Sequence, residues 1–486
     1  MMRSLLLAAF ATGTAFDAVA QSIDTFNPMP DGAPMAIALQ SDGKIIIASQ
    51  IQTVGTTPVD DIARLEPDGS LDPDFIGPSA VNGEIKAVAV QADGKILIGG
   101  TFDSIDTAAH HHLARLNANG TLDSGFADPN LDQTVWSIAV QPDGKIFVAG
   151  DFTLSGSTSR GHLARFNGNG TLDTGFADAQ ICTTRASSVV LQSNGDVVVG
   201  GYFAHIGNCS GAPYHFYLAR YSSTGVLDAT FPDTAASSAI TAIVAGPDDS
   251  LYVNGGYAVG TGGIRLAAKL SANGTLVSNY DDLANDGATD SLALQADGKL
   301  LIGGTFETVD TQSRHGLARL NANGSLDAGF ADLHFSLTNV NANGTIYGLA
   351  AQSDGKTIAA GNFTLVNGQP RQSMARVNVA DLATSTLKGQ ASGSNVIVTW
   401  TRSGASPELA QPPVLMHSVN GTTYSSIGTM ARISTGWQLT APYNVNGSPF
   451  YLRADAYTSS GAGNGSAGRI DSPVYVSDRI FANGFE

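Results

Sequence analysis

The sequence predicts an all-β protein built from repeated units, and three observations support this prediction. The stretch QADGKILIGGTF at residues 91–102 recurs in close copies along most of the 486-residue chain. The apolar runs of each copy are short and rich in β-branched residues, as in strands, and no window sustains the 3.6-residue period of a helix. The 56 glycines among 43% hydrophobic residues indicate many short strands and tight turns rather than disorder.

Each unit of the repeat is interpreted as four strands. The runs KAVAVQ and KILIGGTF, within residues 86–102, flank an Ala-Asp-Gly turn whose glycine supplies the positive φ that a hairpin needs. A second motif follows, LARLNANGTLDSGF at residues 113–126. In this motif an alternating strand turns at Ala-Asn-Gly into the short strand TLDSGF.

Seven such units follow one another. The turn glycine marks six of them, at Gly43, Gly94, Gly144, Gly195, Gly298 and Gly355, and Asp249 takes its place in a degenerate copy. A four-stranded unit that recurs about every 50 residues is typical of a β-propeller blade. The sequence therefore predicts a seven-bladed β-propeller over residues 21–385, followed by a small β-sandwich.

The two ends of this region favour a closed ring over an open solenoid, which would need capping repeats. Residues 22–26, SIDTF, match the SLDxxF half of the second motif but precede the first full unit. The seventh unit, MARVNVADL at residues 374–382, lacks this half. We therefore expect the N-terminal segment to supply the outer strand of the last blade and to close the ring.

The linked pair of motifs, DGKILxGGxF followed by LARLNxxGxLDxxF, resembles the delta-60 repeat, a bacterial β-propeller family whose function is not established. The resemblance covers about residues 22–382. It is specific, because two linked motifs recur in the same order. It implies a fold and gives no chemistry.

The first 20 residues are interpreted as a secretory signal peptide. Arg3 precedes the apolar run of residues 5–10, and Ala18-Val19-Ala20 forms a small-x-small cleavage site. The apolar stretch is shorter than the ~20 residues that span a bilayer, so a membrane anchor is the weaker alternative. We expect a secreted or cell-surface protein after cleavage near Ala20.

Residues 386–476 lack the repeat and are similar to a fibronectin type III sandwich. NVIVTWT (395–401) predicts a strand with Trp400 pointing inward, and Tyr451, Arg453 and Ala456 fall near the pattern of a late strand of that fold. Such modules usually act as spacers or adhesion units. The tail at residues 477–486, which includes DRIFANGFE, is either a sorting or processing signal or a terminus without a role.

The charge of the chain excludes one class of partner. With 25 Lys and Arg against 42 Asp and Glu, the net charge is −17. Phosphate backbones and anionic membrane surfaces both require clustered cations. We therefore expect no nucleic acid partner and no membrane insertion, and we expect a monomer.

The two cysteines, Cys182 and Cys209, lie in one unit. If residues 193–195 close a hairpin, Cys209 lies within about two residues of facing Cys182, and an oxidising compartment then favours a disulfide. Two buried thiols are the alternative.

The sequence offers no convincing catalytic constellation. Serine-hydrolase elbows, phosphate loops, dinucleotide fingerprints and zinc-helix motifs do not occur in it. A calcium interpretation of Asn117, Asn119 and Asp123 is weaker than turn geometry, because calcium loops usually bring several carboxylates. A zinc interpretation of residues 110–112, His-His-His, is likewise weaker than loop hydrogen bonding. We therefore predict no catalytic residue, no metal and no cofactor.

A recurring arginine of the second motif is predicted to pair with the recurring aspartate. The fifth unit supports the pairing because it loses both at once, with Lys269 and Val277 in their places. The arginines are Arg64, Arg115, Arg165, Arg220, Arg319 and Arg376, and the aspartates are Asp72, Asp123, Asp173, Asp228 and Asp327. We interpret these residues as structural ion pairs rather than as an anion-binding ring.

Function is expected on the face whose connections differ from unit to unit, at residues 103–112, 153–162, 204–216, 307–316 and 331–344, because the turns of the other face are alike. The candidate ligand-binding residues of this face are Trp136, His205, Tyr214, His215, Phe216, His334 and Phe335. The leading hypothesis is a secreted, non-catalytic propeller that binds an extracellular protein or carbohydrate. Two alternatives stay open, an extracellular hydrolase or lyase with its site at the channel mouth, and a structural surface protein without a defined ligand.

Overall fold

The computed structural model describes residues 21–207, 216–233, 236, 238–255, 267–277, 286–338, 342–379, 381, 383–392, 395–442, 450–461 and 467–476. Every helix or strand in these ranges is a β-strand, which confirms the all-β prediction. Within them no helix is long and apolar enough to cross a membrane. The predicted signal peptide, the tail at 477–486, Cys209, Tyr214 and His215 lie outside the described residues.

The repeat forms antiparallel three-stranded meanders, seven of them within the described ranges, numbered here as units 1 to 7. Their strands are β2 (Ala36–Leu39), β3 (Ile45–Ala48) and β6 (Ile62–Leu65); β7 (Ile85–Val90), β8 (Ile96–Gly100) and β11 (Leu113–Leu116); β12 (Val135–Val140), β13 (Ile146–Gly150) and β16 (Leu163–Phe166); β17 (Ile181–Leu191), β18 (Val197–Ile206) and β19 (Leu218–Tyr221); β20 (Ile243–Ala245), β21 (Leu251–Val253) and β22 (Ala268–Leu270); β23 (Thr289–Leu294), β24 (Leu300–Gly304) and β27 (Leu317–Leu320); and β29 (Thr345–Ala351), β30 (Thr357–Asn362) and β33 (Met374–Asn378).

The turn between the first two strands of a unit forms as its sequence predicts. In unit 2, Gly94 has a φ of 84° and donates its N–H to the carbonyl of Gln91. The Asp93 carboxylate accepts the N–H of Lys95 at 3.1 Å and so fixes the turn from within. Asp249 replaces the glycine in unit 5 with a φ of 58°, which aspartate tolerates better than most residues.

The predicted fourth strand is smaller than expected. In unit 2 it is a single bridge between Leu116 and Leu122 rather than a strand. The N–H of Asp123 then bonds the Arg115 carbonyl, and the Asp123 side chain accepts the N–H of Gly125, so that the chain turns away after one bridge.

Short hairpins in the connections after the second strand were not predicted from the sequence. They are β4 (Thr53–Val54) with β5 (Thr57–Pro58), β9 (Ser104–Ile105) with β10 (Ala108–Ala109), β14 (Leu154–Ser155) with β15 (Thr158–Ser159), β25 (Thr308–Val309) with β26 (Gln312–Ser313), and β31 (Leu365–Val366) with β32 (Gln369–Pro370). In unit 7 a further strand, β28 (Phe335–Ser336), adds to β31.

The units follow one another around a common centre. The first strands contact in the order β2, β7, β12, β17, β20, β23 and β29, and β29 contacts β2 again. The core sits between neighbouring units: one buried cluster joins Ile37 and Ile45 of unit 1 to Ala350 and Ile358 of unit 7. The last unit is therefore packed against the first.

The N-terminal segment adds a strand to unit 7, where the half-motif places it. Strand β1 (Ser22–Ile23) pairs antiparallel with β33. Asp24 accepts a hydrogen bond from Arg376 at 2.6 Å, and the fully buried ring of Phe26 lies 5.0 Å from the Arg376 guanidinium. The N-terminus thus supplies the aspartate and the phenylalanine that unit 7 lacks.

The C-terminal unit, residues 384–476, has two sets of strands around one core. One sheet holds β34 (Thr384–Ser392), β35 (Asn395–Ser403), β39 (Gly436–Pro442) and β38 (Ala431–Ile433). The other set holds β36 (Val414–Ser418), β37 (Ser425–Thr429), β40 (Phe450–Gly461) and β41 (Ala467–Val476). Trp400, predicted to point inward, is fully buried in a cluster that includes Leu415 and Leu452 of the second set.

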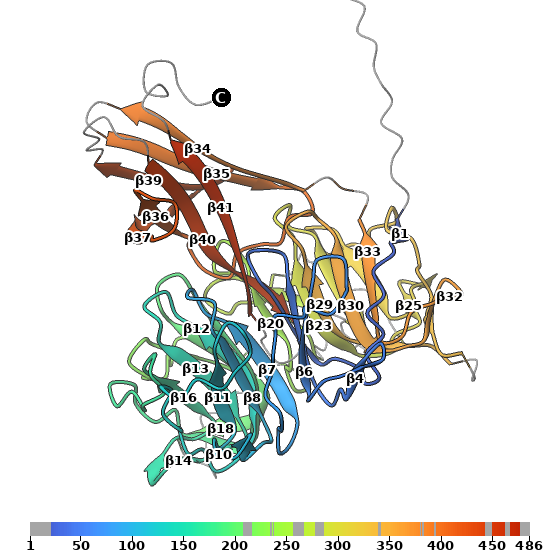
Figure 1. The fold of residues 1–486 in the computed structure, drawn as a ribbon, viewed down its shortest axis with the longest axis horizontal. Helices are drawn as coiled ribbons and strands as arrows, with labels where there is room; N and C mark the ends of the chain where they lie inside the picture. Colours follow the sequence, from blue (N-terminus) through green and yellow to red (C-terminus); the bar gives the residue numbers. More distant parts are fainter. Residues whose placement is uncertain are drawn as a thin grey trace, which may run out of the picture.

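A long hairpin fastens the C-terminal unit to the repeat units. Strands β40 and β41 run from the C-terminal sheets in among the units (Figure 1). Ser460 and Gly461 of β40 pair with β23, and Ala467 of β41 pairs in parallel with Ala89 of β7. The sheets of units 2 and 6 are thereby joined through the hairpin into one continuous sheet. The C-terminal unit is therefore docked on the repeat units, a contact that the sequence did not predict.

Candidate functional site

One repeat position carries a different side chain in every unit. It lies eight residues before the turn glycine, as Lys86 does before Gly94. The neighbouring residues are near copies from unit to unit, which makes this variation conspicuous. The seven residues are Met35, Lys86, Trp136, Ser187, Thr241, Asp290 and Tyr347, and together with Arg185 and Tyr202 they line one cavity of about 280 Å³.

A β-bulge presents this position to the cavity in five of the seven units. In β7 the pairing with β8 skips Lys86, and β12 skips Trp136 in the same way. The corresponding residues of units 4, 6 and 7 are also skipped. A bulge leaves its extra residue outside the ladder and re-aims the side chain, which is a common arrangement beside binding sites.

The bulge explains a glycine that the repeat retains in its second strand. A Cβ on Gly100 would lie 1.9 Å from the Glu84 carbonyl oxygen, and one on Gly304 would lie 2.0 Å from that of Ala288. Only glycine allows the two backbones to approach this closely. The glycine that ends this part of the second strand, preceded by glycine in units 2, 4 and 6 and by alanine in units 3 and 7, is therefore a sequence signal for the bulge.

Cations and aromatic rings alternate along one wall of the cavity. The Arg185 guanidinium lies 4.0 Å from the Trp136 ring centroid and 5.7 Å from that of Tyr202. The Lys86 ammonium lies 5.4 Å from the Trp136 ring. Asp151 fixes the row, because it accepts hydrogen bonds from the Trp136 indole and from Arg185 Nε, both at 3.0 Å. These contacts hold the wall in one geometry before any ligand arrives.

The charges of the wall are balanced locally. Lys86 forms an ion pair with Glu84, and Arg185 forms one with Asp151. The remaining acid of the lining is Asp290, and burial raises its pKa to about 6. Near neutral pH this carboxyl group is partly protonated and can accept or donate a hydrogen bond.

The hairpin of the C-terminal unit pairs with two of the first strands a few residues away from the cavity lining. Gly461 lies beside Leu292, two residues along β23 from Asp290, and Ala467 lies beside Ala89, three residues along β7 from Lys86. The C-terminal unit itself contacts the far ends of the first strands, where Gln411 donates to the carbonyl of Val140 at 2.9 Å. Among the described residues, the cavity and this contact with the C-terminal unit therefore lie at opposite ends of the first strands.

The structure brings one of the predicted ligand-binding residues, Trp136, into this cavity. His205 lies on β18 opposite Cys182, and Phe216 lies 6.1 Å from the ring of Tyr217. His334 lies 4.2 Å from the ring of His315. Phe335 is fully buried and packs against Phe363, so its ring belongs to the core of unit 7.

Sequence reasoning missed most of the lining, including Lys86, Arg185, Asp290, Tyr202 and Tyr347. The signal that could have found it is the comparison of equivalent positions in the seven copies. A position that differs in every unit of a strand with a shared apolar pattern is not required by the fold, and the glycine retained in the second strand indicates that its side chain is re-aimed.

The arginine and aspartate of the second motif form ion pairs. The distances are 2.5 Å for Arg64 and Asp72, 2.7 Å for Arg115 and Asp123, 2.7 Å for Arg165 and Asp173, 2.6 Å for Arg220 and Asp228, and 2.8 Å for Arg319 and Asp327. Lys95 of the turn joins the pair of unit 2 at 2.8 Å.

The arginines also connect neighbouring units, which the sequence did not predict. Arg165 donates to the Ser223 carbonyl of unit 4 at 2.5 Å, and Arg220 donates to the Ala272 carbonyl of unit 5 at 2.7 Å. Arg376 of unit 7 donates to the carbonyl of Pro67 in unit 1. These guanidinium groups are engaged by the aspartates and by carbonyl groups of neighbouring units, which supports a structural role for them.

The histidine and turn side chains bond within their loops. His112 Nδ1 lies 3.2 Å from the Gly100 carbonyl, and His111 Nδ1 lies 2.6 Å from Asp128. Asn119 accepts the N–H and the hydroxyl of Thr121. Across the described ranges, no three His, Cys, Asp or Glu side chains gather as a metal site would require.

Repeated β-meanders packed around a centre, with the last unit against the first, define a protein of the β-propeller class. The family described as domain of unknown function (DUF5122) beta-propeller matches residues 40–75, 91–126, 141–176, 192–231, 295–330 and 352–380. Repeats of this β-propeller family therefore run along the chain.

Other comparisons add little. No curated protein matches the chain. A solved structure of S. cerevisiae Dbp5 bound to Nup159, Gle1, IP6 and ADP has 10% identity and a TM-score of 0.35, over 74% of this chain and 93% of that chain. Sucrose-6-phosphate hydrolase from Lactobacillus gasseri has 12% identity and a TM-score of 0.26, over 86% and 90%. At these TM-scores neither structure identifies a fold or a function for this chain.

Proposed function

We propose that this protein is a secreted, non-catalytic binding protein, in which a seven-bladed β-propeller holds a carbohydrate in the cavity at the start of its inner strands. One observation carries the proposal: seven different side chains, one from each unit and all from the same repeat position, surround a single cavity. A repeated scaffold has no structural need for such variation, whereas a ligand that is asymmetric around the ring requires it.

The chemistry of the lining favours a sugar. Trp136, Tyr202 and Tyr347 offer aromatic surface, while Thr241 and Asp290 offer hydrogen-bonding groups of both kinds. A cavity of about 280 Å³ is slightly smaller than the ~300–1,000 Å³ typical of ligand pockets. We therefore propose a small sugar or the end of a chain as the ligand, rather than a long polysaccharide segment.

The rest of the architecture belongs to the same proposal. The contact of β29 with β2 and the pairing of β1 with β33 support a closed ring of seven blades. The common core of the two C-terminal strand sets supports a fibronectin type III-like sandwich. Export through residues 1–20 would allow a disulfide between Cys182 and Cys209, which an intact mass rising by two protons on reduction would establish.

An extracellular hydrolase or lyase is the second candidate, and Asp290 is the observation that favours it. A carboxyl group with a pKa of about 6 could act as a general acid near neutral pH. Glycoside hydrolysis usually needs a second carboxylate across the scissile bond. The described lining offers none, because its other titratable groups are Lys86, Arg185 and two tyrosines. Binding is therefore the better supported function.

The test uses the chain from residue 21 to 486 with a panel of neutral and acidic mono- and oligosaccharides, measured by calorimetry and by thermal unfolding. A sugar at 100 times its dissociation constant should stabilise the fold by about 2.7 kcal/mol. Tyr347→Ala should abolish this gain, while Val226→Ala, at an exposed residue outside the lining, should leave it unchanged. Product release from a bound sugar would instead establish the hydrolase or lyase, and silence across the panel would refute carbohydrate binding.

A further inference from the structure

A carboxylate holds the linker between units in place at three junctions. After units 2, 3 and 6, an aspartate two residues beyond the phenylalanine of the second motif accepts the N–H of the residue two positions before the third strand. The pairs are Asp128 with His111 at 2.9 Å, Asp178 with Gly161 at 2.7 Å, and Asp332 with His315 at 3.0 Å. A side-chain donor completes each arrangement, which we call the clasp: His111 Nδ1 at 2.6 Å, Ser159 Oγ at 2.7 Å and His315 Nδ1 at 2.5 Å.

In unit 1 the aspartate is at the other of the two clasp positions. Gly77 stands where the other units have the aspartate, and Asp60 stands where they have His111, Gly161 or His315. The linker is held further along instead, where Asp106 accepts the N–H of Ser79 at 2.6 Å and its hydroxyl at 2.8 Å. At this junction the carboxylate lies on the other side: Asp60 accepts a backbone hydrogen bond from Val81 of the linker, and no side-chain donor of the kind that completes the clasp is seen at Asp60 among the described residues.

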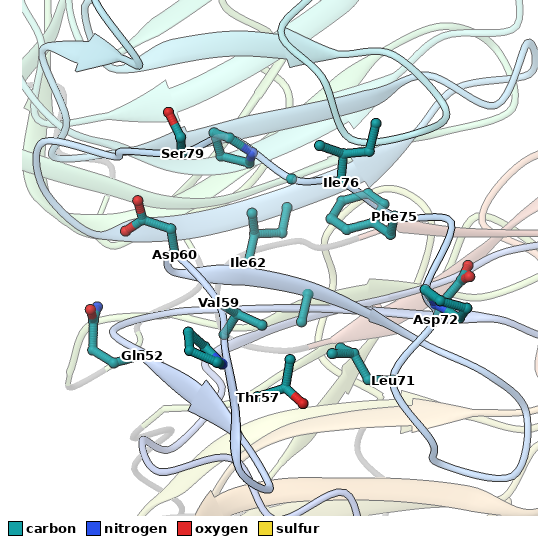
Figure 2. A pocket seen from close by; sticks show the side chains of 15 residues that line it. Gln52, Thr57, Val59, Asp60, Ile62, Leu71, Asp72, Phe75, Ile76 and Ser79 are labelled. Atoms are coloured by element: carbon teal, nitrogen blue, oxygen red, sulfur yellow. The ribbon is translucent and has the colours of Figure 1, made fainter.

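A groove of about 570 Å³ lies at this junction. Figure 2 shows Asp60 and Ser79 at one end, Asp72 at the other, and Val59 and Ile62 between them, with Phe75 and Ile76 along the linker. The Ile76 side chain is 70% exposed, the second highest value among the large hydrophobic residues that are described. The residues that line the groove include no lysine, arginine or histidine.

The two acidic side chains of the groove differ in whether they form ion pairs. Asp72 is already paired with Arg64 and Lys44. Asp60 lies in no ion pair among the described residues, and burial, together with the neighbouring charge of Asp106, raises its pKa. A cation placed at Asp60 would offset both effects, whereas an anion would add to the repulsion.

We propose that this groove binds a basic peptide segment of a partner protein, with a lysine side chain directed to Asp60. The aliphatic stem of lysine covers apolar surface while its ammonium group reaches a polar end, and here Ile62, Phe75 and Ile76 provide the apolar wall. The incoming ammonium takes the place of the donor that the clasp has in units 2, 3 and 6. The groove volume lies within the ~300–1,000 Å³ range of ligand pockets.

The probe is a fluorescein-labelled peptide of alternating leucine and lysine, compared with matched leucine–glutamate and leucine–glutamine peptides by fluorescence anisotropy. We expect the lysine peptide to bind the full chain about tenfold or more tightly than either control. Methyl NMR of the isoleucines should place the shifts at Ile62 and Ile76. No binding of the lysine peptide, equal binding of the three peptides, or shifts at other isoleucines would each overturn the proposal.

Two variants separate the groove from the general negative charge of the protein. Asp60→Asn keeps the shape of the side chain and should raise the dissociation constant of the lysine peptide by about tenfold. The double change Asp60→His with Gly77→Asp installs the residues of the clasp, and should abolish binding. Gly77 has a φ of 68°, which aspartate tolerates, and its Cβ would meet nothing closer than 3.8 Å. Asp93→Asn, at an exposed turn outside the groove, is the matched control, and a loss there equal to that of Asp60→Asn would refute the site.

Discussion

The two ends of the first strands differ in how strongly the repeat keeps their residues the same from unit to unit. At the turn end, every unit but the fourth and fifth repeats the same turn lysine and the same arginine–aspartate pair, and the arginines reach across to the next unit. At the cavity end, one position carries seven different side chains. The repeat therefore concentrates its stabilising contacts at one end and leaves the other free to vary.

Unit 5 shows how far the turn end tolerates change. Lys269 replaces the arginine and Val277 replaces the aspartate, and the Lys269 ammonium lies 5.1 Å from the ring of Tyr252 instead. Unit 5 therefore has a cation–π contact, of the kind that Arg115 makes with Phe126 in unit 2, but not the ion pair. The turn end can lose one pair without losing the arrangement of the units.

The largest expected effect comes from removing the N-terminal strand that pairs with unit 7. Deletion of residues 21–27 removes β1, exposes the site of the buried Phe26 ring and leaves Arg376 without Asp24. Loss of a buried phenylalanine alone costs about 3–5 kcal/mol, so we expect a loss of at least about 5 kcal/mol in unfolding free energy by denaturant titration. Ser22→Ala serves as the control, and an unchanged transition in the deletion would contradict closure by this strand.

A single pair at the turn end should also matter. Burial alone would raise the pKa of Asp123, but hydrogen bonds from Lys95 and from the N–H of Gly125 lower it to about 2. Asp123→Ala leaves the buried Arg115 unpaired and should cost about 3–4 kcal/mol at pH 7. Because the folded pKa lies below the unfolded one, this contribution is present above pH 4 and fades as the pH falls toward 2.

Unit 5 provides the matched control for that prediction. Val277→Ala changes the same repeat position where no ion pair exists, and should cost about 1 kcal/mol or less. Equal losses for the two variants would show that the aspartate contributes only packing, and the contrast between the units would disappear.

Much of the turn end could be predicted from the sequence, because its contacts are local and repeated. The Asp-Gly turn is encoded in three adjacent residues, and the joint loss of arginine and aspartate in unit 5 identified the pair. The half-motif at residues 22–26 likewise predicted a strand whose partner lies more than 350 residues away, since Ser22 pairs with Asn378.

The cavity end and the hairpin could not be predicted in the same way. Ala467 pairs with Ala89, and neither segment has a sequence feature that predicts this pairing. Trp136 was predicted to bind a ligand because it is an aromatic residue on the face whose loops vary. The cavity around it depends on bulges in different units, which direct Lys86, Asp290 and Tyr347 into the same space. Such a site is assembled across units, so residue spacing within one unit cannot identify it.

At the cavity end, stability should respond to pH with the opposite sign. Burial raises the pKa of Asp290 to about 6, above its unfolded value, so the folded state binds the proton more tightly. Stability should therefore fall by about 1–3 kcal/mol as the pH rises from 4 to 6, and stay level above. Burial raises the pKa of Asp61 to about 6 as well, so Asp290→Asn should remove only the contribution of Asp290 to this slope in urea titrations at several pH values, while Asp93→Asn retains the whole slope. An unchanged slope in Asp290→Asn would assign it to Asp61 or to another group.

The smallest stability effect is expected at the rim of the cavity, where it should accompany a large effect on binding. Tyr202 is 48% exposed and covers one side of the Arg185 guanidinium. Tyr202→Ala should change the unfolding free energy by no more than about 0.5 kcal/mol, as is usual for surface positions. It should nevertheless raise the dissociation constant of the tightest-binding sugar of the panel by about tenfold or more, because the aromatic ring of Tyr202 is lost from the cavity wall. Val226→Ala, also exposed but at the turn end, should change neither quantity. If Tyr202→Ala left the dissociation constant unchanged, the assignment of ligand binding to the cavity end would be wrong, because the variation of residues there would not be explained by a ligand.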